Sequence, residues 1–232
     1  MDLQRYLNDP VAVTLILTSA IAVALFIYLL VSTVRIRNLR RIAFSKFASA
    51  TGFSFAEKLK SYSDTGLPET RLLGVGFDNS YRNIIRGEVR GAAVVAFDHG
   101  FVMVSGRSTT KREQTVVAIS IKDSGLPSFS VMQKDLIHKI GDALRPKGID
   151  LDRFPEFSKK YLLSVADENE AGALFGSKAI NLYMDKLACE VEVCDGWLFL
   201  YQIGKHLMAL EVQERIDATF EFLQELKHGQ EG

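Results

Sequence analysis

The sequence predicts an α+β fold, in which an N-terminal transmembrane helix precedes a mostly antiparallel sheet domain with helices packed on it. Three observations support this prediction. Residues 11–33 contain no charged side chain. They are followed by short segments rich in β-branched and aromatic residues, with no helix-length segment between them as parallel strands would require. Close to the C-terminus, apolar residues recur at helical spacing and predict a C-terminal amphipathic helix.

The predicted transmembrane helix has the sequence VAVTLILTSAIAVALFIYLLVST over residues 11–33. At about 1.5 Å per residue, this stretch spans a hydrocarbon core of roughly 30 Å. A helix buried in a protein core is rarely apolar on every face. A cleaved signal peptide would instead have a basic leader, a shorter apolar stretch and an A-x-A-like cleavage site. The sequence has none of these three features and therefore favours a lasting membrane anchor.

Charged residues beside this segment predict its orientation. The short tail over 1–10 carries Asp2 and Asp9 against Arg5, whereas a predicted juxtamembrane helix over 34–52 is basic. Its basic side chains are Arg35, Arg37, Arg40, Arg41 and Lys46. Because positive charge collects on the cytoplasmic side, the N-terminus is expected outside and the domain over 53–232 in the cytoplasm, at the inner membrane of a bacterium.

The overall charge balance limits the classes of partner. The chain has 28 Lys and Arg against 28 Asp and Glu, and six of the basic but only two of the acidic residues lie within 1–50. The remainder is mildly acidic, which argues against a nucleic-acid-binding body. Two interpretations of the basic neck stay open. Its arginines either set the membrane topology alone or also contact anionic lipid headgroups; those proposed for contact are Arg35, Arg37, Arg40 and Arg41.

The body begins with segments that predict an antiparallel meander. These segments are RLLGVGF (71–77), RNIIRGEV (82–89), AAVVAFD (92–98), FVMVSG (101–106) and TVVAISIK (115–122). FDHGF, at 97–101, is expected to form a tight turn between two of them. Helices are expected at about 132–144, 167–187 and 206–227, the last with an apolar stripe. That stripe consists of Val212, Ile216, Phe220 and Leu223. The proline-containing connector over 145–161 leaves open a division into two lobes, 53–144 and 160–232.

The segment CEVEVCDGWLFLY predicts a hairpin, because Asp195-Gly196 is a strong two-residue turn signal between alternating apolar residues. One face of this hairpin is expected to be core. The other face carries an aromatic stripe of Trp197, Phe199 and Tyr201 opposite acidic residues. This stripe is either covered by a helix or forms a surface for a protein partner.

The two cysteines, Cys189 and Cys194, lie five positions apart on one predicted strand, so their thiols point to opposite faces. They are expected neither to form a disulfide nor to chelate a metal together. His138, His206 and His228 are scattered and lack a second ligand at helical spacing. The sequence therefore predicts no metal site and no cofactor.

A repeated pentapeptide raises the question of a catalytic pair: DTGLP at 64–68 and DSGLP at 123–127 resemble the motif of aspartic peptidases. Asp64 and Asp123 could in principle share a proton and activate water. However, the polar KSYS precedes Asp64, and only 59 residues separate two aspartates that would each need a lobe of roughly 100 residues. Turn chemistry explains the same string, so we expect both carboxylates in separate surface loops.

Two further groups of residues are candidates for chemistry. GRSTTKR, at 106–112, could hold an anion through Arg107, Lys111 and Arg112, although a solvated hairpin loop is the alternative. Asp98 and His99 could form an acid–base pair, although neighbouring residues on a strand point apart.

Five short segments, RNIIRG, AFDHGF, QTVV, LPSF and FSKKYLL, together resemble a family of uncharacterised bacterial single-pass membrane proteins over roughly 75–205. The resemblance implies an anchored domain with no established activity, cofactor or catalytic residue.

Two function hypotheses follow. The favoured one is a cytoplasmic interaction or scaffolding module that is held at the membrane and binds a protein partner. The alternative is a membrane-tethered, hydrolase-like enzyme whose polar residues converge only in three dimensions, with Asp98, His99 and the 106–112 loop as candidates. A deep pocket with His99 beside a carboxylate would support the enzyme, and a flat aromatic patch would support the module.

Overall fold

A computed structural model describes most of the chain, and it divides into two compact units, Met1–Ile42 and Ala43–Gly232. The described residues are 10–70, 73–74, 76–105, 108–135, 148–165 and 174–230.

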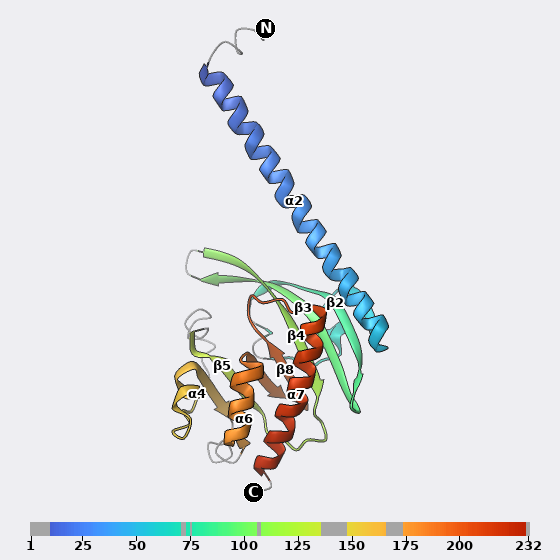
Figure 1. The fold of residues 1–232 in the computed structure, drawn as a ribbon, viewed down its shortest axis with the longest axis vertical. Helices are drawn as coiled ribbons and strands as arrows, with labels where there is room; N and C mark the ends of the chain where they lie inside the picture. Colours follow the sequence, from blue (N-terminus) through green and yellow to red (C-terminus); the bar gives the residue numbers. More distant parts are fainter. Residues whose placement is uncertain are drawn as a thin grey trace. The chain divides into compact units, whose positions relative to one another are not determined.

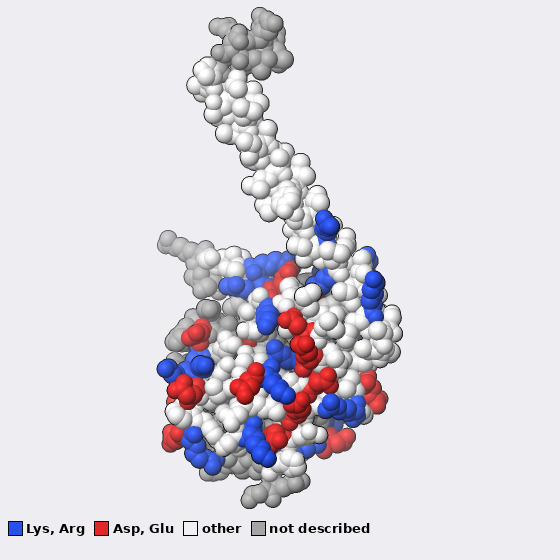
Figure 2. All heavy atoms as spheres, viewed as in Figure 1, with Lys and Arg blue, Asp and Glu red and all other residues white. Residues whose placement is uncertain are grey.

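Helix α2 (Pro10–Thr51) is a single uninterrupted helix that contains both the predicted transmembrane segment and the predicted basic juxtamembrane helix. Its most apolar 18-residue window has a mean hydropathy of 2.5, and none of that window is buried. Hydroxyl groups of Thr14, Thr18 and Thr33 donate to backbone carbonyls one turn earlier, so their polarity is satisfied within the helix. By length and composition α2 is a candidate membrane anchor, and Figure 2 shows an uncharged stretch that gives way to basic side chains.

The body is built on one antiparallel sheet of eight strands in the order β1-β2-β3-β4-β8-β7-β5-β6 (Figure 1). The strands are β1 (Ser54–Leu59), β2 (Phe77–Val89), β3 (Ala92–Ser105), β4 (Ser108–Ser120), β5 (Phe129–Gln133), β6 (Tyr161–Val165), β7 (Glu190–Cys194) and β8 (Trp197–Tyr201). This arrangement confirms the predicted α+β class with a mainly antiparallel sheet. Strands from both ranges proposed as lobes share the sheet, since β4 pairs with β8.

One face of the sheet is covered by helices near the C-terminus. These are α6 (Ser177–Leu182), the π-helical segment η3 (Tyr183–Leu187) and α7 (Ala209–Gln230), which lie over the same face in Figure 1. Of the predicted stripe on α7, Val212, Ile216 and Leu223 are buried in this core, whereas Phe220 is half-buried. The short helix α4 (Pro155–Lys160) leads directly into β6.

The opposite face of the sheet is covered by the connection between β1 and β2, which includes the short 3-10 helix η1 (Ser63–Thr65). Leu67 and Leu73 of this connection pack with Phe199 and Tyr201, and Trp197 lies at the edge of the same cluster. Phe199 is fully buried and Tyr201 is 2% exposed. The chain itself therefore covers Phe199 and Tyr201 of the proposed partner surface, whereas Trp197 is half-buried, and a partner contact at Trp197 stays a prediction.

The segment expected to form a tight turn at 97–101 instead lies in the middle of β3. All positions from Val94 to Ser105 pair with β4 in one unbroken register. A strand is compatible with the polar residues here because both Asp98 and His99 find side-chain partners on neighbouring strands. The helices expected at 132–144 and 167–187 were also placed imprecisely. Residues 132–133 lie in β5, while 136–147 and 166–173 lie outside the described residues.

The hairpin of β7 and β8 confirms the prediction from Asp195-Gly196. Val193 lies opposite Leu198, and both turn residues have positive φ values of 48° and 72°, as a type I′ turn requires. Cys189 and Cys194 are free thiols that pack in the clusters on opposite faces, as the alternation of a strand demands.

Candidate functional site

Buried polar side chains of β2, β3 and β4 converge around Asp98, which is 6% exposed. Its Oδ2 accepts a hydrogen bond from Asn83 Nδ2 at 2.8 Å, and its Oδ1 accepts one from Thr115 Oγ1 at 2.8 Å. Asn83 sits at a register shift between β2 and β3 and has a φ of 51°, which asparagine tolerates better than most residues. The irregular backbone thus brings this amide to the carboxylate.

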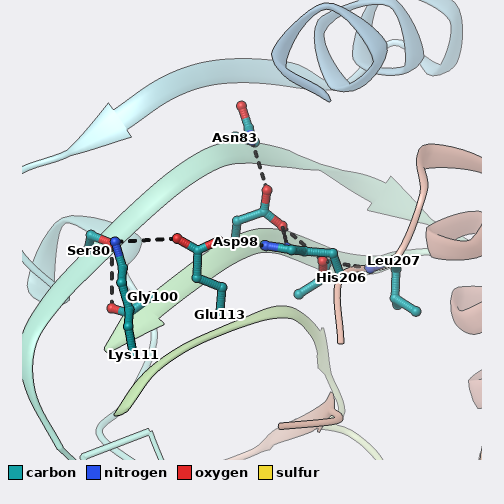
Figure 3. A network of polar contacts seen from close by, with 9 residues as sticks. Ser80, Asn83, Asp98, Gly100, Lys111, Glu113, His206 and Leu207 are labelled. Atoms are coloured by element: carbon teal, nitrogen blue, oxygen red, sulfur yellow. Dashed lines mark hydrogen bonds and ion pairs between the residues drawn. The ribbon is translucent and has the colours of Figure 1, made fainter. Parts of the chain in front are cut away.

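His206 completes the group from the loop between β8 and α7 (Figure 3). Its Nδ1 lies 3.3 Å from Asp98 Oδ1, and its Nε2 lies 3.2 Å from Glu113 Oε2. The loop is held by Thr115, whose N–H donates to the Lys205 carbonyl and whose Oγ1 accepts the Leu207 N–H. A doubly protonated imidazole donates to both carboxylates, whereas a neutral ring has one N–H. Glu113 continues the chain to Lys111, with Nζ 3.5 Å from Oε1.

His99 lies on the other face of β3 and has no carboxylate partner among the described side chains. Its ring stacks between Tyr81 and Phe101, with centroid distances of 5.3 and 4.9 Å. Nδ1 is 3.4 Å from the Gln114 Nε2 donor, and Nε2 is 2.8 Å from Asn79 Oδ1, so the neutral ring donates through Nε2. Burial lowers the pKa of His99 to about 4.

Asp98 and His99 do not form the acid–base pair of the hydrolase-like alternative. Asp98 and His99 point to opposite faces of β3, and the hydroxyl beside Asp98, Thr115 Oγ1, is engaged as both donor and acceptor. The arrangement can relay a proton between Asp98 and Glu113 through His206. Its contacts connect the β8–α7 loop to β3 and β4. Within the described ranges, no group of three or more His, Cys, Asp or Glu is placed to hold a metal ion.

The predicted anion-binding residues are separated by the structure. Arg107 lies outside the described residues, while Lys111 and Arg112 are neighbours on β4 and so project to opposite faces. Lys111 joins a basic cleft with Lys58, Lys60 and Arg82, which sequence reasoning did not connect with it. Of the neck residues, Arg35 and Arg37 are exposed on α2, whereas Arg40 and Arg41 are half-buried. Lipid contact by this neck stays a prediction.

The aspartates of the repeated pentapeptide occupy different loops and are both exposed, as expected. Asp64, in η1, accepts the backbone N–H groups of Lys60 and Ser61, and the Ser61 bond is the main cause of its lowered pKa. Asp123 follows β4. In each copy the hydroxyl after the aspartate accepts the N–H of the leucine two residues on, at 3.2 Å, and the glycine has positive φ. The repeat is a turn motif.

Glu190 on β7 is a buried acid outside the Asp98 group. It is 1% exposed and lies opposite Tyr201 of β8. Within the described part of the chain, neither Glu190 Oε2 nor the Tyr201 hydroxyl has a hydrogen-bond partner. Burial raises the pKa of Glu190 to about 7, despite backbone hydrogen bonds that oppose the shift.

Sequence reasoning missed the partners of Asp98. His206 was set aside as scattered, and it is separated from Asp98 by 108 residues. No local spacing links His206, Asn83 or Thr115 to Asp98, because the register of four strands brings them together.

No family model and no curated protein matches this chain. A solved structure with a similar fold is the crystal structure of the mycobacterial trehalose monomycolate transport factor A, TtfA. The TM-score is 0.52 at 12% sequence identity, and the match covers 82% of this chain and 93% of that chain. At this identity the likeness shows the fold alone. It supports the α+β fold described for this chain.

Proposed function

We propose that this chain is a bacterial inner-membrane protein that holds a non-catalytic module at the cytoplasmic face. There the module recruits a protein partner and acts as an accessory factor in a membrane transport process. The observation that carries the proposal is that the apolar helix α2 runs without interruption into a body with the fold of a transport factor. Phe44 and Ala48, in the last turns of α2, are buried in that body's core.

The polar residues of the body support a binding role over catalysis. Asp98 and Thr115 form hydrogen bonds within the sheet, and the ring of His99 stacks between two aromatic rings. These side chains stabilise the fold, and none is presented to a substrate in an enclosed cavity. On the face shown in Figure 2, basic and acidic side chains of the body are intermingled, which suits recognition of a protein better than that of nucleic acid.

Orientation is part of the same proposal. Arg35, Arg37, Arg40 and Arg41 lie at the end of α2 that continues into the body. Because such residues favour the cytoplasmic side, we propose that the body lies there and the opposite end of the helix outside.

Capture of the tagged full chain from solubilised membranes tests the proposed function. The matched control replaces residues 11–33 with an unrelated apolar helix of equal length, which preserves the anchor but removes its sequence. We expect both forms to retain the same protein partner, in the same amount per captured chain, because the body makes the contact. A chain that recovers no partner from its native membranes, while the purified protein turns over a substrate, would contradict the proposal.

A further inference from the structure

We propose that a basic cleft formed by β1, β2 and β4 binds a phosphate group, carried either by a phospholipid headgroup or by a soluble phosphate compound. The cleft has a volume of about 550 Å³, and its lining includes the basic residues Lys58, Lys60, Arg82 and Lys111 and one acidic residue, Asp78. Clefts of this size accommodate small polar ligands. This inference is independent of the protein partner proposed above.

The strongest observation is a pair of like charges that the sheet register places together. Lys58 of β1 is directly opposite Arg82 of β2. Side chains at such positions lie close together, and two cations there are destabilising. On its other side Arg82 faces Asp98, but that carboxylate already accepts bonds from Asn83, Thr115 and His206. An anion between the two cations relieves the repulsion.

The other charges of the cleft are partly compensated by their neighbours. Lys111 lies 3.5 Å from Glu113 Oε1, so it is anchored at the rim by the chain of contacts that leads to His206. Lys60 interacts electrostatically with Asp64. Neither Lys58 nor Arg82 forms an ion pair with another side chain in the described ranges.

One neutral hydroxyl, that of Ser80, also lies in the cleft lining. Its Oγ donates a long hydrogen bond of 3.5 Å to the Gly100 carbonyl, and a phosphate oxygen can replace this weak acceptor. A Cβ at Gly100 would come within 2.7 Å of that hydroxyl, so glycine leaves room for Ser80.

This set of donors fits phosphate better than an apolar or cationic ligand. A guanidinium binds two phosphate oxygens at once, an ammonium adds a point charge, and a hydroxyl group satisfies a further oxygen.

The test uses the full chain in neutral detergent micelles and measures binding by calorimetry. The two probes are pyrophosphate and dioctanoylphosphatidylglycerol, each titrated separately. In the variant K58Q/R82Q, we expect affinity for the bound probe to fall by at least about tenfold, because two charge-assisted contacts are lost. The matched control, K159Q/K160Q, removes two exposed charges from α4 and should bind like the unmodified chain.

A second variant works in the opposite direction and does not depend on removing cations. D78N eliminates the cleft carboxylate, and asparagine tolerates the positive φ of 53° at this position. We expect binding to tighten by about threefold or more. Thermal unfolding of each variant checks its fold, and K58Q/R82Q should unfold no lower than the unmodified chain, because a repulsive pair is removed.

The probes distinguish the source of the phosphate. Binding of the lipid alone identifies a headgroup site, binding of pyrophosphate alone identifies a soluble ligand, and binding of both supports the shared chemistry. Failure of both probes to bind, or an equal loss in the control variant, overturns the proposal.

Discussion

Replacement of Glu190 by glutamine is expected to stabilise the protein at pH 8 and to have little effect at pH 4. The pKa of Glu190 is raised from 4.5 to about 7, with burial as the main cause. Between these values the unfolded chain releases its proton while the folded chain retains it, so stability falls as pH rises. Above pH 7 the fold holds a buried carboxylate at a cost of about 3 kcal/mol. Glutamine has nearly the same shape and carries no charge.

The measurement is denaturant unfolding of the full chain in micelles at both pH values, expressed as the difference between variant and unmodified protein. That difference cancels the contribution of His99, whose lowered pKa acts in the opposite direction, removing stability as pH falls below about 6.5. Glu214→Gln, an exposed change on α7, is the control. If Glu190→Gln raises the free energy of unfolding equally at pH 4 and pH 8, the Glu190 carboxylate is not a destabilising buried charge at pH 8, and the account is contradicted.

Replacement of Asp98 by asparagine is expected to destabilise the protein by about 3 kcal/mol. The two carboxylate oxygens accept from donors on different sides, Asn83 Nδ2 on one and Thr115 Oγ1 on the other. An asparagine keeps the shape but must point its NH2 group at one of these donors, whichever way the amide is turned. A buried donor then loses its partner, and His206 loses the charge that it faces.

Glu113→Gln is the matched control for Asp98→Asn, because it changes the other carboxylate beside His206. The side chain of Glu113 is 38% exposed. Its cost should stay below about 1 kcal/mol, as for other solvent-screened pairs. Thermal and denaturant unfolding compare the two variants. If Asp98→Asn costs no more than Glu113→Gln, the buried network does not support the fold, and Asp98 would have to be explained by another role.

The parts of this fold that depend on local chemistry could be predicted from sequence. Asp195-Gly196 specifies its own turn, and the alternation around it then fixes which residues of β7 and β8 share a face. The two D-[ST]-G-L-P segments likewise form turns through bonds between residues two to four apart. The uncharged run in α2 is equally local, since its length and composition suffice.

Features that depend on distant parts of the chain were not predictable in this way. Asp98-His99 looked like a turn because two adjacent polar residues interrupt an apolar strand, and only their partners on β2 and β4 allow them to remain in β3. Burial of Phe199 and Tyr201 depends on the connection containing Leu67 and Leu73, more than a hundred residues away. The register that sets Lys58 against Arg82 is also a property of the assembled sheet.

The most direct test of a membrane-anchored module is to locate both ends of the chain relative to the bilayer. One fusion carries a reporter after Gly232, and a second carries the same reporter ahead of Met1. A reporter active only in the cytoplasm is expected to work after Gly232 and to fail ahead of Met1, because we propose that α2, a candidate span, crosses the membrane once with its arginines inside. Activity of both fusions would show that α2 does not span the membrane, and activity only ahead of Met1 would reverse the orientation; either result would contradict the account.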